Sequence, residues 1–371
     1  MNPRATWKAA LPVRIAGLGS HLPSRVVTND DLAQVLDTND EWIRTRTGIR
    51  QRHYAAPEQA TSDLAVEAGK AALADAGLGI EDISSIVLAT TTPDHTVPGT
   101  APIVAAKLGT EATAFDVNAA CSGFLYALRV GAGMVATGDG AVLIIGAETL
   151  TRIVDPQDRN VAILFGDGAG AVVLVPDDTA AMGPFDLGAD GTDPSMLWTE
   201  SGGTRQPVDA AVLEARTQFM TMRGGDVYRN AVARMSGSSQ VVLDRAGLTI
   251  DDVDLFIGHQ ANIRILDAVG KRLGIDGSKV HITVDQHGNT SAASVPLALT
   301  DARNAGRLTP GDTVLLTAFG AGFTWGSTLL TWQPDKAGTG GVEVVADTGT
   351  EAEGEVVDTV QQDLASGGET A

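Results

Sequence analysis

Short apolar runs alternate with longer amphipathic stretches along most of the chain. Apolar runs predict buried strands at residues 86–90, 141–146, 171–175, 255–258 and 313–317. Residues 63–76 and 263–273 have apolar positions at helical spacing, and the glycines that follow them, Gly77 and Gly274, favour helix termination. This alternation predicts an α/β protein with largely buried sheets.

The chain contains an internal repeat. Residues 76–87 (AGLGIEDISSIV) and 246–257 (AGLTIDDVDLFI) share a helix end, an acidic pair and a strand. The further matched segments are 107–109 (KLG) with 272–274 (RLG), and 141–146 with 313–318. Three matches in the same order predict two duplicated halves. Strand ends and helix N-termini of both halves can then converge on one ligand site between them.

We place the N-terminal half at residues 1–182 and the C-terminal half at residues 183–334. The remaining segment, 335–371, contains nine acids and one base and is rich in Gly, Glu, Asp and Thr. Such a composition predicts a disordered acidic tail. The tail carries −8 of the formal net charge of −20.

The composition excludes several classes of protein. The chain is 43% hydrophobic, which is ample for a large core. It has no long cluster of Lys and Arg, so we expect no nucleic-acid partner. No apolar run approaches the roughly 20 residues that span a bilayer, so we expect no membrane partner. The single cysteine cannot form a disulfide within the chain and fits a reducing, cytoplasmic compartment.

That single cysteine, Cys121, is a candidate nucleophile. It lies in residues 116–123 (DVNAACSG), after a predicted strand and before the helical stretch 124–135. The positive end of a helix lowers the pKa of a thiol, so we expect the reactive thiolate to be favoured. The small flanking residues would allow the backbone to approach the sulfur closely. The alternative is a small buried apolar side chain, the commoner role of a free cysteine.

Two further polar residues occupy places where sites are built in α/β proteins. His259 directly follows the predicted strand 255–258. Asn289 lies in residues 287–294 (HGNTSAAS), the counterpart of the cysteine turn in the second half. His287 competes with Asn289 for a site role, and spacing alone does not choose between them.

Two glycine-rich segments need separate interpretation. Residues 320–322 (GAG) follow the predicted strand 313–317 through Phe319, so they offer backbone N–H groups to an oxyanion or form a tight turn. Residues 166–170 (GDGAG) precede a strand rather than opening a helix, which argues against a dinucleotide-binding loop.

Six segments in order resemble the 3-oxoacyl-[acyl-carrier-protein] synthase III family of the thiolase superfamily, the condensing enzymes that start fatty-acid chains. They are 40–52 (DEWIRTRTGIRQR), 116–125 (DVNAACSGFL), 158–170 (DRNVAILFGDGAG), 259–265 (HQANIRI), 287–294 (HGNTSAAS) and 319–326 (FGAGFTWG). The resemblance runs from about residue 13 to about residue 332. It implies a five-layered αβαβα thiolase-like fold and a homodimer.

The resemblance also implies an acyltransferase activity. Cys121 would accept an acyl group from coenzyme A, and the backbone N–H groups of Cys121 and Ala321 would form an oxyanion hole. Malonyl on an acyl carrier protein would decarboxylate, with His259 and Asn289 stabilising the enolate that attacks the acyl-cysteine. The expected product is a 3-oxoacyl carrier protein. Both thioesters are substrates, and no metal or other cofactor is implied.

The family places coenzyme A between Trp42 and Arg159, with Arg46 near its phosphates and Asn262 near its pantetheine. Trp and Arg can sandwich an adenine by stacking and cation–π contact. Without the resemblance, Trp42 would be interpreted as a core residue, and Asn262 as the N-cap of the helix that follows.

An acidic carrier protein needs a local basic patch on this acidic enzyme. Arg264, Lys271 and Arg272 stand at i, i+7 and i+8 of one predicted helix, hence on one face, and we expect them to dock the carrier protein. The alternative is an ordinary solvated basic face.

Single residues separate the chain from related enzymes. It lacks the second catalytic cysteine of degradative thiolases, has Asn289 where the elongating synthases have a second histidine, and keeps the cysteine that silent subunits lose. A specialised relative that primes a polyketide, or transfers an acyl group in secondary metabolism, uses the same three residues and stays open as an alternative.

The chain also departs from the family pattern at four positions. Gly258, Ala321 and Gly225 stand where Pro, Gly and Asn are usual in the family. Val97 falls where many members carry an aromatic residue that closes the acyl pocket of the dimer partner. The smaller valine predicts a longer pocket, for medium or branched primers.

Overall fold

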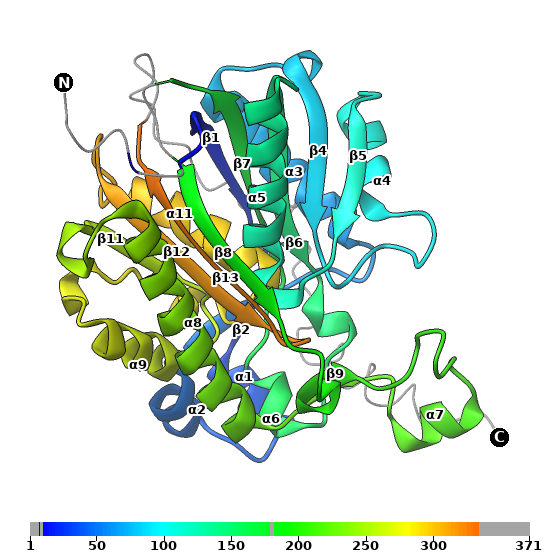
Figure 1. The fold of residues 1–371 in the computed structure, drawn as a ribbon. Helices are drawn as coiled ribbons and strands as arrows, with labels where there is room; N and C mark the ends of the chain where they lie inside the picture. The colour runs from blue at the N-terminus through cyan, green and yellow to red at the C-terminus, as the bar shows by residue number, and fades with distance from the viewer. Residues whose placement is uncertain (1–6, 8–9, 179–181, 334–371) are drawn as a thin grey trace.

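Two β-sheets organise the computed structural model, which describes residues 7, 10–178 and 182–333 (Figure 1). The first sheet has the strand order β1 (Val13–His21), β7 (Gly168–Pro176), β6 (Ala141–Glu148), β4 (Ile83–Ala89) and β5 (Thr113–Val117). The second has the order β11 (Leu255–Gly258), β12 (Thr313–Gly320), β13 (Thr324–Thr331) and β8 (Met182–Ala189). Strand β5 forms one open edge of the first sheet.

Helices cover and separate these sheets in five layers. Helices α3 (Thr61–Ala76) and α4 (Thr100–Leu108) cover the outer face of the first sheet. Helices α5 (Gly123–Thr137) and α11 (Ser294–Asn304) contact both sheets from the layer between them, and α8 (Gly224–Ala246) and α9 (Ile263–Leu273) cover the second sheet. The order of layers is α, β, α, β, α, as predicted.

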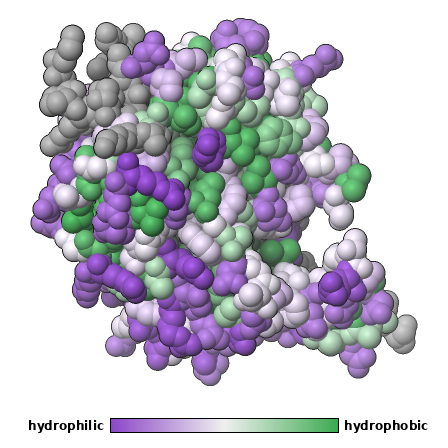
Figure 2. All heavy atoms as spheres, viewed as in Figure 1, coloured by the Kyte–Doolittle hydropathy of each residue, from purple (hydrophilic) through white to green (hydrophobic). Residues whose placement is uncertain are grey.

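Shorter elements complete the fold around these layers. They are β2 (Arg25–Thr28), β3 (Gln51–Tyr54), α1 (Asn29–Ala33), α2 (Asp40–Thr47), α6 (Arg159–Ala162), β9 (Leu197–Thr199), α7 (Ala210–Ala215), β10 (Met220–Met222) and α10 (Val284–His287). The segment that carries α7 projects from the body of the molecule (Figure 1). Hydrophilic residues prevail along the lower edge of the face seen in Figure 2.

The two sheets repeat one pairing pattern. Strand β6 is parallel to β4 and antiparallel to β7, and β12 is parallel to β11 and antiparallel to β13. The repeated sequence forms corresponding turns, η2 (Ile80–Asp82) before β4 and η6 (Ile250–Asp252) before β11. The predicted boundary after residue 182 falls at the first residue of β8, and the predicted tail, 335–371, lies outside the described residues.

Local sequence explains where the predicted elements begin and end. Helix α9 spans the predicted range because the Asn262 side chain accepts a hydrogen bond from the Arg264 N–H, and Gly274 ends the helix in the left-handed conformation (φ 75°). Strands β6 and β12 continue past their apolar runs, to Glu148 and Gly320, because both remain paired with a neighbouring strand there. These extensions bring both strand ends to the middle of the molecule.

The central layer begins with two matching turns. The turn η3 (Ala120–Ser122) precedes α5, and η8 (Ser291–Ala293) precedes α11; the two turns contact each other. Ala120 (φ 47°) and Ser291 (φ 48°) have left-handed backbone conformations that are uncommon for residues other than glycine. The window Ala120–Thr137 is long and apolar enough to cross a membrane, but it packs as the core helix α5 between the sheets. Its apolar character is thus explained by the core.

Candidate active site

One cavity of about 1070 Å³ opens beside the two central turns. Predicted site residues among its lining are Trp42, Arg46, Cys121, His259, Asn262, Arg264, Asn289 and Ala321. Its apolar lining includes Leu150, Phe165, Leu197, Met220, Met222 and Phe319. The lining therefore comes from both sequence halves, as expected for a site between them.

Cys121 is the middle residue of η3, directly before α5. Its side chain is only 9% exposed. The pKa of the thiol is raised to about 12, mainly because the thiol is buried; interaction with the Ser291 hydroxyl limits this rise, and the negative charge of Glu148 contributes to it. The expected lowering of the thiol pKa is wrong, because the loss of solvent around a buried thiol outweighs the favourable position at a helix start.

His259 follows β11 and is held in place through both backbone and side chain. Its N–H donates to the Thr317 carbonyl at 2.8 Å, and its Nδ1 lies 2.6 Å from the Ser294 hydroxyl oxygen. The imidazole is buried, which lowers its pKa to about 3. The ring is therefore neutral at physiological pH and has Nε2 left for chemistry in the cavity.

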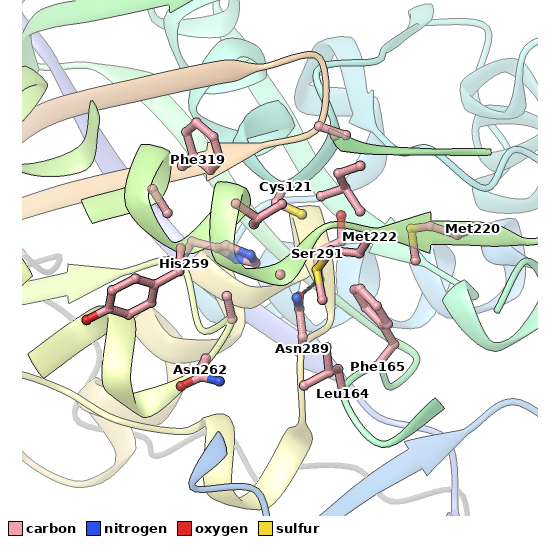
Figure 3. A pocket seen from close by; sticks show the side chains of 18 of the residues that line it. Cys121, Leu164, Phe165, Met220, Met222, His259, Asn262, Asn289, Ser291 and Phe319 are labelled. Carbon is pink, nitrogen blue, oxygen red and sulfur yellow. Dashed lines mark hydrogen bonds between the residues drawn. The ribbon is translucent and has the colours of Figure 1, made fainter. Parts of the chain in front are cut away.

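Asn289 is fixed by the backbone on both sides. Its N–H donates to the Leu164 carbonyl at 2.8 Å, and its own carbonyl accepts from the Gly166 N–H at 3.1 Å. Its side-chain Oδ1 accepts from the Ser291 N–H at 2.9 Å. Because Oδ1 is engaged, the amide nitrogen points into the cavity, where Cys121 and His259 also point (Figure 3).

The end of β12 packs against the backbone of the cysteine turn. A Cβ placed on Gly320 would lie only 2.5 Å from the Cys121 nitrogen, so a glycine is needed for this approach. Ala321, next along the chain, lines the cavity. Its φ lies outside the left-handed region, so the side chain that replaces the usual glycine is tolerated without backbone strain.

The outer part of the cavity carries the aromatic and basic residues predicted to bind coenzyme A. The guanidinium of Arg46 lies 4.3 Å from the Trp42 ring centroid, and that of Arg159 lies 4.8 Å from it. Arg159 also donates to the Asp37 carbonyl at 2.5 Å. Asn262 caps α9 and donates from its side chain to the Arg46 carbonyl at 3.1 Å. Trp42, Arg46 and Asn262 therefore line the cavity, and Arg159 lies next to it through its contact with the Trp42 ring.

His287 belongs to a different environment from Asn289. It packs against His53, with 5.9 Å between the ring centroids, and it is not part of the cavity lining. Burial lowers its pKa to about 4. Of the two residues that the sequence left open, Asn289 is the one that reaches the cavity.

Comparison with known proteins identifies the family to which the chain belongs. Residues 115–191 match the family model described as 3-oxoacyl-[acyl-carrier-protein (ACP)] synthase III, and residues 243–332 match the model of its C-terminal part. The Streptomyces coelicolor protein named beta-ketoacyl-[acyl-carrier-protein] synthase III 3 is 50% identical over 323 residues, which cover 86% of this chain and 96% of that protein. The chain belongs to this family.

Solved structures of family members superpose closely on the chain. The 3-oxoacyl-(acyl carrier protein) synthase III of Pseudomonas aeruginosa is 44% identical, with a TM-score of 0.80 over 87% of this chain and 98% of the other. The priming β-ketosynthase of the R1128 polyketide pathway is 36% identical, with a TM-score of 0.82 over 89% of this chain and 99% of the other. The thiolase-like fold and the family predicted from six motifs are thereby confirmed.

Several predicted residues lie outside the centre of this synthase III site. Val97 is 85% exposed and lines a second cavity, which shares Thr91, Ile153 and Thr199 with the first. Arg264, Lys271 and Arg272 are all exposed on α9, and Arg264 alone also lines the active-site cavity. Their proposed roles in primer length and carrier-protein docking stay predictions.

Three residues of the site were missed by the sequence analysis. Ser294 contacts His259, the Ser291 hydroxyl lowers the pKa of Cys121, and Glu148 is a buried carboxyl whose charge raises that pKa. One signal was available for Glu148, since an acid at the end of an apolar strand is unusual. The two serines lie in a small-residue run, where nothing in the sequence distinguishes a contact with the site from a helix start.

Proposed function

We propose that this chain transfers an acyl group from a coenzyme A thioester to Cys121 and condenses it with malonyl on an acyl carrier protein. The products are a 3-oxoacyl carrier protein, coenzyme A and CO₂, which is the first condensation of fatty-acid synthesis. The observation that carries the proposal is the meeting of Cys121, from the first half, with His259 and Asn289, from the second, in one cavity.

In the first half-reaction the sulfur of Cys121 attacks the thioester carbonyl. The developing oxyanion lies beside the backbone N–H groups of Cys121 and Ala321, and such preorganised donors stabilise charge without reorganisation. The contact between Gly320 and the Cys121 nitrogen supports this assignment because it brings the two N–H groups to the same place. Trp42 and Arg159 hold the adenine of the bound thioester during this step, and free coenzyme A then leaves.

In the second half-reaction decarboxylation of malonyl leaves an enolate that needs neutral donors. Ser294 Oγ accepts a hydrogen bond from the Gln260 N–H at 3.4 Å, so its own proton is free to be donated to His259 Nδ1. This arrangement puts the ring proton of His259 on Nε2, facing the cavity. Together with the Asn289 amide it offers two donors to the enolate, whose carbon then attacks the acyl-Cys121 thioester.

Mass spectrometry after incubation with a panel of acyl-coenzyme A primers tests the first half-reaction. Because the chain has one cysteine, a thioester adduct is assigned to Cys121 without ambiguity. We expect an adduct on the wild type and none on Cys121→Ser. Malonyl carrier protein should then release the adduct as a 3-oxoacyl carrier protein. Absence of any adduct across the panel would instead favour a catalytically silent subunit.

A second function, priming of a polyketide, is favoured by the similarity to the R1128 priming β-ketosynthase. The apolar lining of the cavity supports a primer longer than acetyl in either pathway. The small side chain of Val97, which is exposed outside this cavity, supports the same preference through the acyl pocket of the dimer partner. Turnover with acetyl- and octanoyl-coenzyme A measures this preference. A strict preference for acetyl would refute the long pocket, and Val97→Phe should shorten the accepted chain.

We further propose a homodimer that works in the cytoplasm without metal or organic cofactor. Two features support the dimer: β5 leaves one edge of the first sheet unpaired in the described chain, and the apolar Val97 side chain is exposed. Light scattering of the purified chain measures its mass directly. A monomer at micromolar concentration would contradict this part of the proposal.

A further inference from the structure

The carboxyl of Glu148 is buried beside the nucleophile and has no part in the reaction proposed above. Glu148 ends β6 and its side chain is fully buried. Four donors converge on its Oε2: the Thr90 hydroxyl at 3.2 Å, the Thr91 N–H and hydroxyl at 3.0 Å each, and the Thr92 hydroxyl at 2.8 Å. Its Oε1 has no well-formed hydrogen bond within the described residues. One oxygen is thus held by four donors, and the other is buried without such a partner.

The Ser291 hydroxyl connects this carboxyl to the thiol. The turn η8, which begins with Ser291, contacts both η3, which holds Cys121, and β6, which ends at Glu148. Interaction with the hydroxyl lowers the pKa of each of these two groups. Figure 3 shows the Ser291 and Cys121 side chains close together in the cavity. A serine hydroxyl has one proton and so can donate to only one of its two neighbours at a time. The Ser291 hydroxyl therefore stabilises one negative charge, located either on the Cys121 sulfur or on the Glu148 carboxyl.

The backbone of Ser291 is held in an uncommon conformation to make this connection. Its φ of 48° is left-handed, a conformation that is unfavourable for a residue with a side chain. Such strain concentrates at functional sites. The backbone N–H of the same residue orients Asn289, so this one residue contacts two of the three reacting side chains.

We propose that Glu148 accepts, through the Ser291 hydroxyl, the proton that the Cys121 thiol loses during acyl transfer. The proposal rests on the acyl-transfer function described above. The thiol proton moves to Ser291 Oγ while the Ser291 proton moves to Glu148 Oε1, and the sulfur bonds to the thioester carbon. The bond from that carbon to the coenzyme A sulfur breaks, and the departing thiolate takes the proton back along the same path. The carboxylate is restored, and free coenzyme A leaves as a thiol.

The electrostatics of the site agree with this path. Burial raises the pKa of Glu148, so the carboxyl is a stronger base than an exposed one. The titratable groups here are Glu148 on β6, Cys121 on η3 and His259 after β11, and the loop after β4 contributes threonine hydroxyls. His259, with its pKa lowered to about 3, is a poor proton acceptor.

Replacing Glu148 by glutamine tests the path while keeping the clamp. The glutamine carbonyl can accept from the same threonine donors, and its NH₂ group takes the place of Oε1, which then cannot receive a proton. We measure the single-turnover rate of Cys121 acylation from about pH 6 to about pH 9. The wild-type rate should level off once the carboxyl is ionised, because the pair of Cys121 and Glu148 then shares one proton.

The Glu148→Gln rate should fall about 10²-fold at pH 7 and recover about tenfold per pH unit, because only direct ionisation of the thiol remains. Ser291→Gly removes the hydroxyl, keeps the N–H that orients Asn289 and suits the left-handed backbone, so it should give the same profile. Ser122→Ala is the matched control, because it also removes a buried hydroxyl from the cysteine turn. The Ser122 hydroxyl donates to the Ala119 carbonyl and not to the thiol. The pH profile of this variant should therefore have the same shape as that of the wild type.

The rate of Cys121 alkylation by iodoacetamide over the same pH range provides a readout independent of acyl transfer. The pH dependence of the alkylation rate should change in Glu148→Gln and in Ser291→Gly in the same way as that of the acylation rate. A loss by an equal factor at every pH, or no loss, would overturn the relay and leave Glu148 as a structural clamp. If Glu148→Gln fails to fold, Ser291→Gly alone decides. A wild type that is alkylated but takes no acyl group would refute the proposed function, and the alkylation profiles would still test the relay.

Discussion

Gly320 allows β12 to touch the cysteine turn, and adding one methyl group there should damage catalysis more than stability. The new Cβ would lie 2.5 Å from the Cys121 nitrogen, 3.1 Å from the Ala120 Cβ and 3.1 Å from the Ser122 nitrogen. Backbone atoms cannot rotate away as a side chain can. The turn must therefore move by several tenths of an ångström, at a cost of about 1–3 kcal/mol in the free energy of unfolding.

The same movement displaces an oxyanion donor, because the Cys121 N–H is the group that is pushed. Loss of one such donor costs about 10²–10³-fold in rate. We therefore expect Gly320→Ala to remain folded and to acylate Cys121 about 10²-fold more slowly. Denaturant unfolding and the acyl-adduct time course measure the two effects on one preparation. Gly237→Ala, on the exposed side of α8 with nothing within 4 Å of the new Cβ, is the control and should gain stability. Normal acylation by Gly320→Ala, whatever its stability, would refute the assignment of the oxyanion hole.

Three further predictions concern the second half-reaction, the partner and pH. Ser294→Ala should no longer hold the ring proton of His259 on Nε2, and it should therefore slow malonyl decarboxylation at least about tenfold while the Cys121 adduct forms at the normal rate. An equal loss of rate in both steps would contradict a role of Ser294 in setting the tautomer. Arg264→Glu should raise the KM for the carrier protein and spare acylation by coenzyme A thioesters, and an unchanged KM would exclude Arg264 from docking. The contribution of neutral His259 to stability is complete above its ordinary pKa of 6.5 and should be lost as pH falls toward the folded value of about 3. About 2 kcal/mol of the free energy of unfolding should therefore disappear between pH 6.5 and 5, and His259→Gln, followed by denaturant unfolding, should remove that slope.

The elements that could be predicted from sequence are those whose ends carry their own chemical signals. Helix α9 is bounded by a capping asparagine and a glycine, and β11 by an acid and a histidine, so both have their predicted limits. Strands β6 and β12 extend beyond their apolar residues because their backbones remain paired with a neighbouring strand there. This pairing cannot be seen in the sequence.

The site was predictable where a residue type is tied to one chemistry. Cys121, His259 and Asn289 meet in one cavity, as the motifs indicate. The protonation of the thiol was not predictable, because helix position is visible in a sequence and burial is not. Glu148 was missed for the same reason: its connection to Cys121 runs through Ser291 and depends on the contacts of η8 with β6 and with η3, which join residues more than a hundred positions apart.

Cys121 should become reactive only when the whole chain has been made, because residues of the second half contact the cysteine turn of the first. Gly320 at the end of β12 meets the cysteine turn, and Gly146 on β6 approaches Ala292 in η8 just as closely. A nascent chain contains Cys121 long before it can add β12, and until then it lacks the Ala321 N–H and the contact of Gly320 with the cysteine turn. Selective labelling of this thiol by acyl-coenzyme A would therefore report completed folding during synthesis, and a ribosome-bound chain ending before residue 313 should resist it.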